Sequence, residues 1–589
     1  MKESRHGTVL LVVVVIVMLL SLAAYKSVLT METENVVAAI NSDRIQAQQA
    51  AYSARELLQL MLEQSRQNRN AMGGLQDNPA LFAGSPTVLT MANAASTTTT
   101  DAMPPPFGVV AYALPLPTGR SGANGSDPSS ASTTPDIAGF GASASDSQGT
   151  QIYPPTRFGA KNESAKLHLL KLIEWEASMP GAASEALMQL QGMDAETADA
   201  IMDWLDHDDE PRDNGAESEF YSTLMRPLHP RNGMIRDVDE LLFVKGVSQL
   251  RLFGTETEKP LLPGAGALMG GTPFPTSPAT RSLITASQSS SASFGYATEL
   301  KPTPWIDLLT VYSGERNESY GGRRRIFLNQ DDLQKLHADL VEVMPLDWAN
   351  FIILYRQFGG VTSFSDDLAD NRDVPEVTID FSRPAEVRVR SRFDLFNAVV
   401  ATPSPESDDE EVQTQSPLNW DLSPAELVDW FDRTTLFPWQ RIVGRVNVNE
   451  APREVLMALP GMTEEIADAI LQARSNSNAD QSSRHHAIWL LAEGLVETSA
   501  MEQLLPHITC GGDVYRAEVW GRSNHETPLV RFETVLDATQ ERCRPVYYRE
   551  LDAPTNEIAI LTPDELRAAG LTSNSPTNSP ADFASPNAR

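Results

Sequence analysis

The chain has 589 residues, of which 41% are hydrophobic, and a formal net charge of −32. This length exceeds what one hydrophobic core usually organises, so we expect several domains. The negative charge disfavours nucleic-acid binding, because phosphate backbones are repelled unless a local basic patch overrides the overall field. The sequence contains no G-x-S-x-G, P-loop or H-E-x-x-H signature, and we therefore expect no enzymatic activity.

The amino terminus combines a short basic head with an apolar run. Lys2 and Arg5 precede the run, which extends over residues 9–24. About 17 residues are enough to span a bilayer as a helix. The basic residues before the run place the amino terminus in the cytoplasm. The alternative is a secretory signal peptide cleaved near Ser-Leu-Ala at 21–23, which would make the chain a secreted binding protein.

The helical pattern continues beyond the apolar run. Residues 32–70 contain neither proline nor glycine, and apolar side chains recur there at roughly helical spacing. The first helix-stopping signal is the glycine pair at 73–74. We expect one helix from about residue 8 to residue 70, within a transmembrane and stem segment at 8–72.

The rest of the chain alternates between low-complexity and structured segments. Residues 73–160 form a low-complexity insertion, in which 107–117 predicts a strand. We expect helices in a first helical domain (161–254), a degenerate helical block (301–365) and a second helical domain (418–508). Between and after them we expect a linker (255–300), strands and an acidic linker (366–417, with the strand pattern at 374–400), a C-terminal antiparallel sheet (509–560) and a disordered tail (561–589).

The two helical domains share an internal repeat. The segment around Gly192 matches the segment around Pro460 and Gly461, with an offset of 269 residues throughout. On its face this is a helix-hairpin-helix signature, which often binds the DNA backbone. Both turns, however, are followed by acidic residues, which have the wrong charge for phosphate and suit the positive end of a helix. We interpret both glycines as structural residues that adopt positive φ.

An acidic loop follows the first repeat. It contains Asp206, Asp208, Asp209, Asp213 and Glu217. So many carboxylates within one turn repel one another unless a cation neutralises them, and calcium takes six to eight oxygen ligands. The sixth position is proline rather than glycine, so this is not an EF-hand loop. The alternatives are a solvated acidic loop, or helix capping by Asp208 and Glu217.

The chain has two cysteines, Cys510 and Cys543, and both lie in its last fifth. In an exported domain such a sparse pair forms one disulfide. Two unpaired buried thiols fit the sequence equally well. Neither cysteine belongs to a zinc-type pattern.

The short leader ending in Gly7, the apolar helix and the amphipathic stem resemble a type IV pilin or pseudopilin. In that family a prepilin peptidase cuts after the glycine and methylates the new amino-terminal residue, here Thr8. Most members carry a glutamate five residues into the mature chain, where this chain has Val12. The K component of the type II secretion system (general secretion pathway protein K) characteristically lacks that glutamate, and the chain is similar to this class.

Further segments resemble the K pseudopilins, and together the similarities cover the stem, 161–254 and 418–551. They are KNESAKLHLLKL, ADAIMDWLDHDDEPRDNGAESEFYS, VDELLFVKGV and RVNVNEAPREVLMALPGM. The resemblance implies an α+β fold in which a long N-terminal helix packs on a C-terminal antiparallel sheet, as in pilins. It also implies large inserted helical domains with helix-hairpin-helix or SAM-like repeats.

The resemblance implies a function as well. Such a protein is a minor pseudopilin at the tip of the type II secretion pseudopilus, where it supports assembly and protein export across the outer membrane. Its partners are other minor pseudopilins and the inner membrane, with most of the chain in the periplasm. K pseudopilins bind calcium in their helical domain, which makes the acidic loop the candidate site. The alternative function is a membrane-anchored helix-hairpin-helix DNA-binding protein of the competence type.

Overall fold

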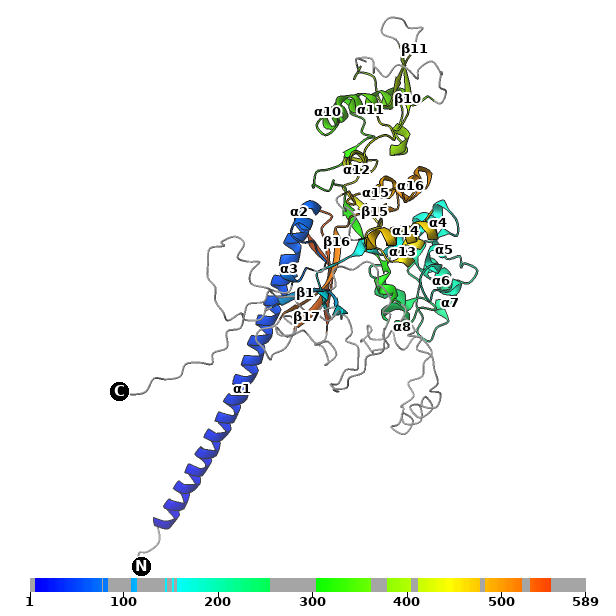
Figure 1. The fold of residues 1–589 in the computed structure, drawn as a ribbon. Coiled ribbons are helices and arrows are strands. Elements are labelled where there is room, and N and C mark those ends of the chain that lie inside the picture. The colour runs from blue at the N-terminus through cyan, green and yellow to red at the C-terminus, as the bar shows by residue number, and fades with distance from the viewer. Residues whose placement is uncertain are drawn as a thin grey trace, which may run out of the picture.

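The computed structural model describes eleven stretches of the chain. They are residues 6–76, 78–82, 107–113, 144–145, 151–152, 156–254, 303–361, 379–403, 411–476, 483–521 and 530–551. The expected linker at 255–300, the expected tail at 561–589 and most of the insertion at 73–160 lie outside these residues. The described part is an α+β structure with one long projecting helix and a broad head (Figure 1).

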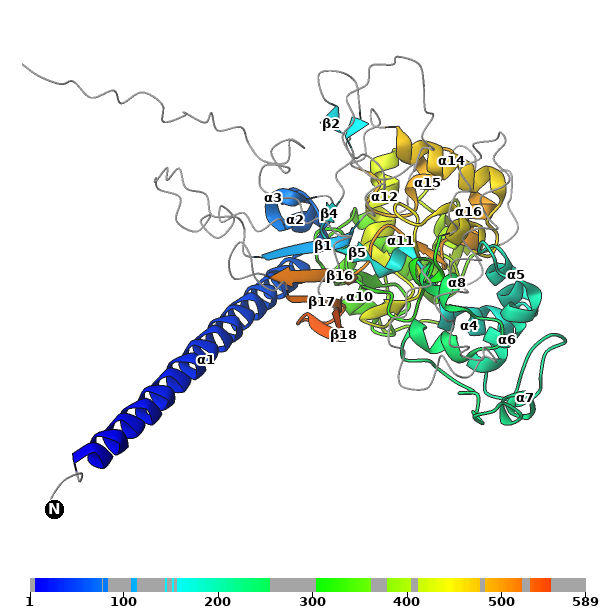
Figure 2. The same ribbon diagram turned by 90° about the horizontal axis from the view of Figure 1, so that it is seen from below.

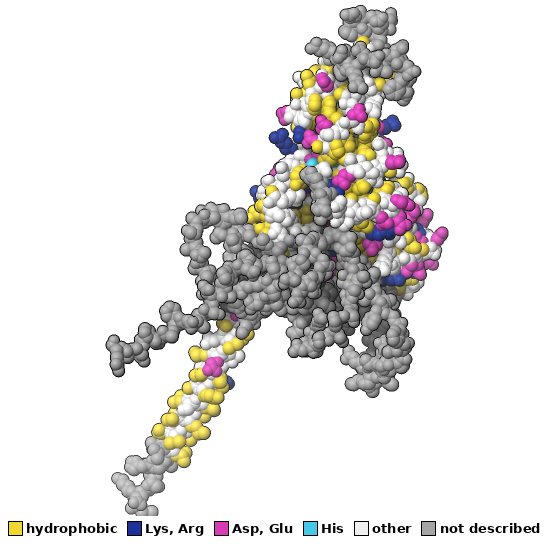
Figure 3. Space-filling view, viewed as in Figure 1, with side chains coloured by type: hydrophobic (Ala, Val, Ile, Leu, Met, Phe, Trp, Pro, Cys, Tyr) yellow, Lys and Arg dark blue, Asp and Glu magenta, His cyan; other side chains and the backbone are white. Residues whose placement is uncertain are grey.

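The long helix α1 (His6–Glu63) confirms the expected stem. From Leu11 onward, α1 is the one helix among the described residues that is long and apolar enough to cross a membrane. Its first half is exposed, and Figure 3 shows this half as a mostly apolar rod outside the head. The helix therefore divides into a free apolar half and a half that joins the head.

The stem helix ends earlier than the sequence predicts. α1 stops at Glu63, and Ser65 begins the short helix α2 (Arg66–Ala71) by accepting a hydrogen bond from the Asn68 amide at 3.2 Å. Arg316 of the head donates to the carbonyl oxygens of Leu62 and Gln64 at 3.1 and 3.0 Å. The expected continuous helix to residue 70 is therefore wrong. A serine cap and a distant arginine together satisfy the backbone groups exposed at the break.

One antiparallel sheet of six strands lies beside the stem helix (Figure 2). The strand order is β18-β17-β16-β1-β4, and β5 also pairs with β16. The strands are β1 (Phe107–Ala113), β4 (Thr156–Phe158), β5 (Lys161–Asn162), β16 (Val514–Gly521), β17 (Val530–Asp537) and β18 (Arg544–Leu551). The strand expected within 107–117 and the C-terminal antiparallel strands are both confirmed.

The second half of α1 packs on this sheet through small and aliphatic residues. Ala51, Ala54 and Leu58 are fully buried in one cluster with sheet residues such as Val519. The close approach requires a glycine at the end of β16. A Cβ on Gly521 would lie 2.1 Å from the carbonyl oxygen of Ala47. Alanines on the helix and glycine on the strand thus bring the two backbones together.

The helices of the head fall in three regions of the sequence, which share one large core. The first domain has α4 (Leu169–Ser178), α5 (Ala182–Met188), α6 (Ala195–Leu205), α7 (Ser218–Ser222), α8 (Gln249–Phe253) and the 3-10 segments η1 (Glu163–Ala165) and η2 (Val238–Phe243). The middle block has η4 (Trp305–Asp307), α10 (Leu333–Val341) and α11 (Leu346–Phe358). The second domain has α12 (Pro424–Arg433), α13 (Arg453–Met457), α14 (Glu464–Ser475), α15 (Trp489–Ala492) and α16 (Thr498–Leu504).

Short two-stranded ladders join these regions. The pairs are β6 (Leu167–His168) with β7 (Leu309–Thr310), β8 (Gly314–Arg316) with β13 (Arg441–Val443), β9 (Ile326–Phe327) with β12 (Thr434–Thr435), and β14 (Val446–Asn447) with β15 (Ile508–Thr509). Each pair joins segments far apart in sequence. The middle block is thereby tied to both helical domains.

The strand prediction for 374–400 is largely wrong. Residues 379–391 have no regular secondary structure, and the 3-10 segment η6 (Arg392–Leu395) follows. The hairpin of this region is formed by β10 (Val399–Pro403) and β11 (Glu411–Gln415), partly inside the expected acidic linker. The segment 379–391 is instead irregular and is held by side chains. Arg356 of α11, for example, donates from Nε to the Val387 carbonyl at 2.8 Å. A second hairpin, β2 (Ala144–Ser145) with β3 (Gln151–Ile152), lies within the insertion.

Candidate functional site

Three carboxylates of the acidic loop converge between α6 and α7. Asp206 directly follows α6, and Glu217 occupies the position just before α7. One oxygen from each of Asp206, Asp208 and Glu217 lies within 4.8 Å of the others. This spacing suits oxygen ligands that surround one calcium ion at about 2.3–2.6 Å. Figure 3 shows acidic side chains gathered on the side of the head that carries α4 to α7.

The carboxyl group of Glu217 receives no hydrogen bond from an N–H group of the described residues, and it lies against the Asp209 carboxylate. The residue is 3% exposed, and neither of its carboxylate oxygens meets a donor among the described residues. Burial, together with the nearby charges of Asp203, Asp206 and Asp209, raises its pKa to about 7. Glu217 stands at the capping position of α7 but makes no capping hydrogen bond, so the capping interpretation is wrong for this residue.

A neighbouring ion pair fixes the shape of the loop. Asp203 is fully buried in α6 and receives the Arg212 guanidinium at 2.7 Å and the Ala216 amide at 2.8 Å. The same Arg212 nitrogen lies 2.5 Å from Oδ2 of Asp206. The other oxygen of Asp206 is buried without a partner. One arginine thus offsets part of the negative charge, and free carboxylate oxygens remain beside it.

The five residues expected to bind calcium do not all converge. Asp209 accepts a hydrogen bond from the Ser218 amide at 3.2 Å, and Asp213 is exposed outside the converging group. Asn232, which the sequence does not single out, lies against the loop and donates to the Asp208 carbonyl. Its own Oδ1 is buried without a partner. The Asn-Gly pair at 232–233 is the sequence signal for this turn, in which Asn232 adopts a φ of 45°.

The residues present fit a calcium ion. Buried oxygens without partners on Asp206, Glu217 and Asn232 are costly unless a cation or donor meets them. All of these donors are hard oxygens, which calcium prefers, and no sulfur or imidazole is among them. Asp206, Asp208, Glu217 and Asn232 are therefore the candidate ligand set.

The repeated turns have the same backbone geometry. Gly192 ends the turn after α5 at φ 78°, and Gly461 ends the turn after α13 at φ 79°. The expected positive φ is confirmed at both glycines. Asp194 and Thr463 then begin the second helix of each pair by accepting hydrogen bonds from backbone amides. Pro460 precedes the second turn, at the place where Gln191 precedes the first.

Basic side chains near these turns are already paired with carboxylates. In the first copy, Arg251 binds Asp194 at 3.0 Å and Lys245 binds Glu196 at 2.9 Å. In the second copy, Arg453 binds both Glu464 and Asp468, at 2.5 and 2.9 Å. Phosphates approaching either turn would meet carboxylates before any free cation, which disfavours binding to the DNA backbone.

The remaining sequence-predicted residues are placed as follows. Cys510 and Cys543 are both free thiols and belong to different hydrophobic clusters, one in the head core and one under the sheet. Gly7 and Thr8 lie in the first turns of α1.

Comparison with known protein families identifies a match within the first helical domain. Residues 166–252 match the family model described as type II secretion system (T2SS), protein K. The matched segment contains the first repeated turn and the whole acidic loop. A search of curated proteins finds no match.

Proposed function

We propose that the chain is the minor pseudopilin at the tip of the pseudopilus, because residues 166–252 match the family model of type II secretion system protein K. In that role it supports pseudopilus assembly and protein export across the outer membrane. The family assignment supports a structural component of the secretion system rather than an enzyme. The specific role at the tip is inferred from α1, which has one exposed apolar half and one half buried against the sheet.

The observation that carries the proposal is the two-part burial of α1. Residues 11–40 expose their apolar side chains, whereas Ala47, Ala51 and Leu58 are fully buried against the sheet. An apolar half of this length suits a bilayer or the stems of partner subunits. The buried half fixes the head to the stem, as a pilin-like subunit requires.

The residue at position 12 supports a place at the tip. Val12 is 53% exposed on the free half of α1, where most pilins carry a glutamate. A carboxylate in the hydrocarbon region is costly unless a neighbouring subunit pairs with it. A subunit with no neighbour above it loses nothing by carrying valine. The head then blocks further addition, with its helical domains and their helix-hairpin-helix repeats as scaffold.

The same proposal fixes the topology. The leader is cut after Gly7, Thr8 is methylated, and α1 anchors the chain once in the inner membrane. The amino terminus faces the cytoplasm, and the head lies in the periplasm with the other minor pseudopilins as partners. Lys2 and Arg5 before the apolar run support this orientation.

We also propose that the acidic loop binds calcium. Asp206, Asp208, Glu217 and Asn232 would hold the ion, which supplies positive charge to a buried anionic cluster. Within the chain, Asp203 and Arg212 keep the loop folded back on α6. The bound calcium ion would stabilise the first helical domain.

The position in the filament is directly testable. The full chain, with an epitope tag after Arg589, is expressed with the other pseudopilins of its secretion system, and sheared pseudopili are labelled with immunogold. We expect gold at one end of each filament. Label along the shaft would contradict a tip role. Retention of the purified full chain on DNA at low salt would instead favour the competence-type alternative.

A further inference from the structure

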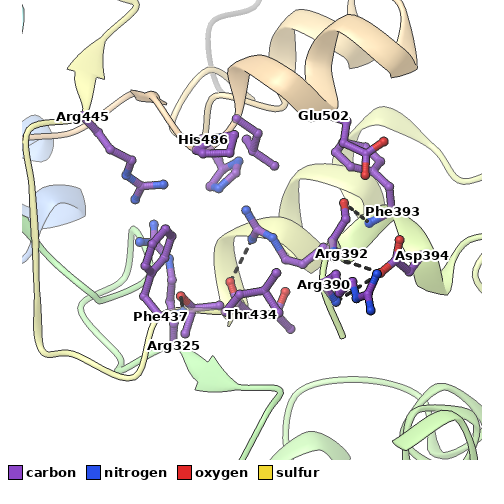
Figure 4. A pocket seen from close by; sticks show the side chains of 15 residues that line it. Arg325, Arg390, Arg392, Phe393, Asp394, Thr434, Phe437, Arg445, His486 and Glu502 are labelled. Atoms are coloured by element: carbon purple, nitrogen blue, oxygen red, sulfur yellow. Dashed lines mark hydrogen bonds between the residues drawn. The ribbon is translucent and has the colours of Figure 1, made fainter. Parts of the chain in front are cut away.

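A cavity of about 540 Å³ lies between the middle block and the second helical domain. Its walls come from residues 390–394, the segment from Thr434 to Phe437, and the end of α16. Figure 4 shows the guanidinium groups of Arg392 and Arg445 directed toward the same space, with His486 above Arg392. Buried positive charge is thus concentrated at one place in a chain whose net charge is −32.

Arg392 is a buried cation that no carboxylate neutralises. It is 8% exposed, and its Nη1 donates to the carbonyl oxygens of Phe431 and Thr434 at 2.6 and 2.9 Å. Its guanidinium carbon lies 4.5 Å from the centre of the Phe431 ring. Among the described residues, Arg392 makes no ion pair. Neutral carbonyls and a ring orient the cation but leave its charge uncompensated.

The carboxylates nearby are already shared among other arginines. Arg325 pairs with Asp432 at 3.3 Å. Glu315 receives Arg445 at 2.6 Å and also Arg66 at 3.1 Å. Both carboxylates are therefore engaged by arginines other than Arg392, and Arg66 is paired with Asp513 as well. Burial and the charges of Arg325 and Arg445 lower the pKa of Arg392 well below its usual value, which is the signature of an unbalanced positive cluster.

His486 adds a neutral donor to the cavity. The residue is 5% exposed, and its Nδ1 accepts a hydrogen bond from the Ile488 amide at 3.2 Å. In the neutral ring the proton is then on Nε2, which is left to donate. Burial, with the charges of Arg392, Arg325 and Arg445, keeps the pKa of His486 well below its ordinary value. The ring is therefore neutral at physiological pH.

Two carboxylates line the rim, and they differ in availability. Asp394 accepts hydrogen bonds from the backbone amides of Arg390 and Ser391 at 3.1 and 2.9 Å, so its oxygens are engaged in a cap. Glu502 is exposed and lines the cavity from α16, away from Asp394 (Figure 4). The negative charge of Glu502 opposes the binding of an anion in the cavity.

We propose that this cavity binds a small organic oxyanion, a carboxylate or phosphate carried on an apolar body. Arg392, Arg445 and His486 would meet the oxyanion, because guanidinium groups bind carboxylate and phosphate oxygens with parallel N–H donors. Phe393, Phe437 and Leu505 would contact the body. The cavity volume lies within the range of small-molecule sites and is larger than an inorganic ion would fill.

Calorimetry on the full chain in detergent tests the proposal, with phenyl phosphate, benzoate, inorganic phosphate and phenol as probes. We expect phenyl phosphate and benzoate to bind, inorganic phosphate to bind more weakly, and phenol to show no binding. Binding should weaken between low and high salt. Equal binding of phenol, or no binding of any anion, would overturn the proposal. Inorganic phosphate as tight as phenyl phosphate would overturn the part that concerns the apolar body.

Substitutions of exposed residues in the lining should leave the fold intact, so they test ligand binding separately from folding. Arg390→Glu reverses an exposed charge in the lining and should weaken the binding of phenyl phosphate by about tenfold. Glu502→Gln removes a negative charge from the lining and should strengthen this binding by a few-fold. Arg388→Glu reverses an exposed charge two residues away, outside the lining, and serves as the matched control. Equal effects of Arg390→Glu and Arg388→Glu would show that only the overall field acts, and would contradict a site at this cavity.

Discussion

Arg69 and Asp513 lie 2.6 Å apart (Nη2 to Oδ1), although 444 residues separate them in sequence. Arg69 belongs to α2, at the end of the stem, and Asp513 directly precedes β16 of the sheet. Asp513 also receives Arg66 at 3.1 Å and the Arg316 backbone amide at 2.7 Å. One buried carboxylate therefore joins the stem, the sheet and the middle block.

Asp513→Asn should loosen the junction of stem and head. Burial raises the pKa of Asp513, but Arg66, Arg69 and Arg316 lower it to well below the usual range, so the group is charged in the fold. Removing that charge leaves the buried Arg69 without a carboxylate partner, which costs about 3–5 kcal/mol. Denaturant unfolding of the full chain in detergent measures the loss. Glu56→Gln, which removes an exposed pair with Arg55, is the control and should change stability by less than about 1 kcal/mol.

Gly521→Ala should separate α1 from the end of β16. The added Cβ would meet backbone atoms, at 2.1 Å from the Ala47 oxygen and 2.5 Å from the Ala51 nitrogen. Overpacking of this kind costs about 1–3 kcal/mol. Hydrogen exchange at amides 47–62 should accelerate. Gly321→Ala, where the nearest atom is a side-chain oxygen at 3.6 Å, is the control. Unchanged exchange in Gly521→Ala would show that the helix does not rest on this strand.

Calcium affinity should rise with pH through about 7. The folded-state pKa of Glu217 is raised above its ordinary value, so the protonated carboxyl stabilises the fold at acid pH, and this contribution is lost as the pH rises through about 7. Calcium binds the carboxylate form, so its affinity should increase about tenfold from pH 6 to pH 8. Calorimetry measures this, and a chelator should lower the Tm of the full chain.

Matched variants distinguish a specific calcium site from diffuse attraction of cations by the negative charge of the loop. Asp208→Asn and Glu217→Gln should weaken calcium binding, and the second should also remove the pH dependence. Asp213→Asn removes an acidic residue of the same loop outside the converging group, so it should leave the affinity unchanged. Equal losses in all three variants would mean that the loop holds cations only diffusely.

Local signals explain what the sequence predicted well. The stem follows from apolar spacing without proline or glycine, and the paired turns follow from glycines at 192 and 461, where positive φ is needed. The C-terminal strands follow from alternation and turn residues. Each of these features depends on residues close together in the chain.

What the sequence did not predict depends on distant partners. The helix break after Glu63 is completed by Arg316, and the acidic loop is completed by Asn232. The cavity around Arg392 draws residues from segments between 325 and 506. No periodicity encodes such contacts, because each side chain looks like an ordinary surface residue in its own segment. The Ala and Leu spacing of the stem likewise gave no sign of where the helix would meet the head.

The mature amino terminus tests the central claim most directly. The full chain is purified from membranes of a strain that contains its prepilin peptidase, and the amino-terminal peptide is identified by mass spectrometry. A strain without the peptidase, in which Met1 should remain, is the control. We expect the chain to begin at Thr8 and to carry one methyl group on its amino nitrogen. A chain that begins after Ala23, or one that keeps Met1 in both strains, would contradict the account of this protein as a pseudopilin.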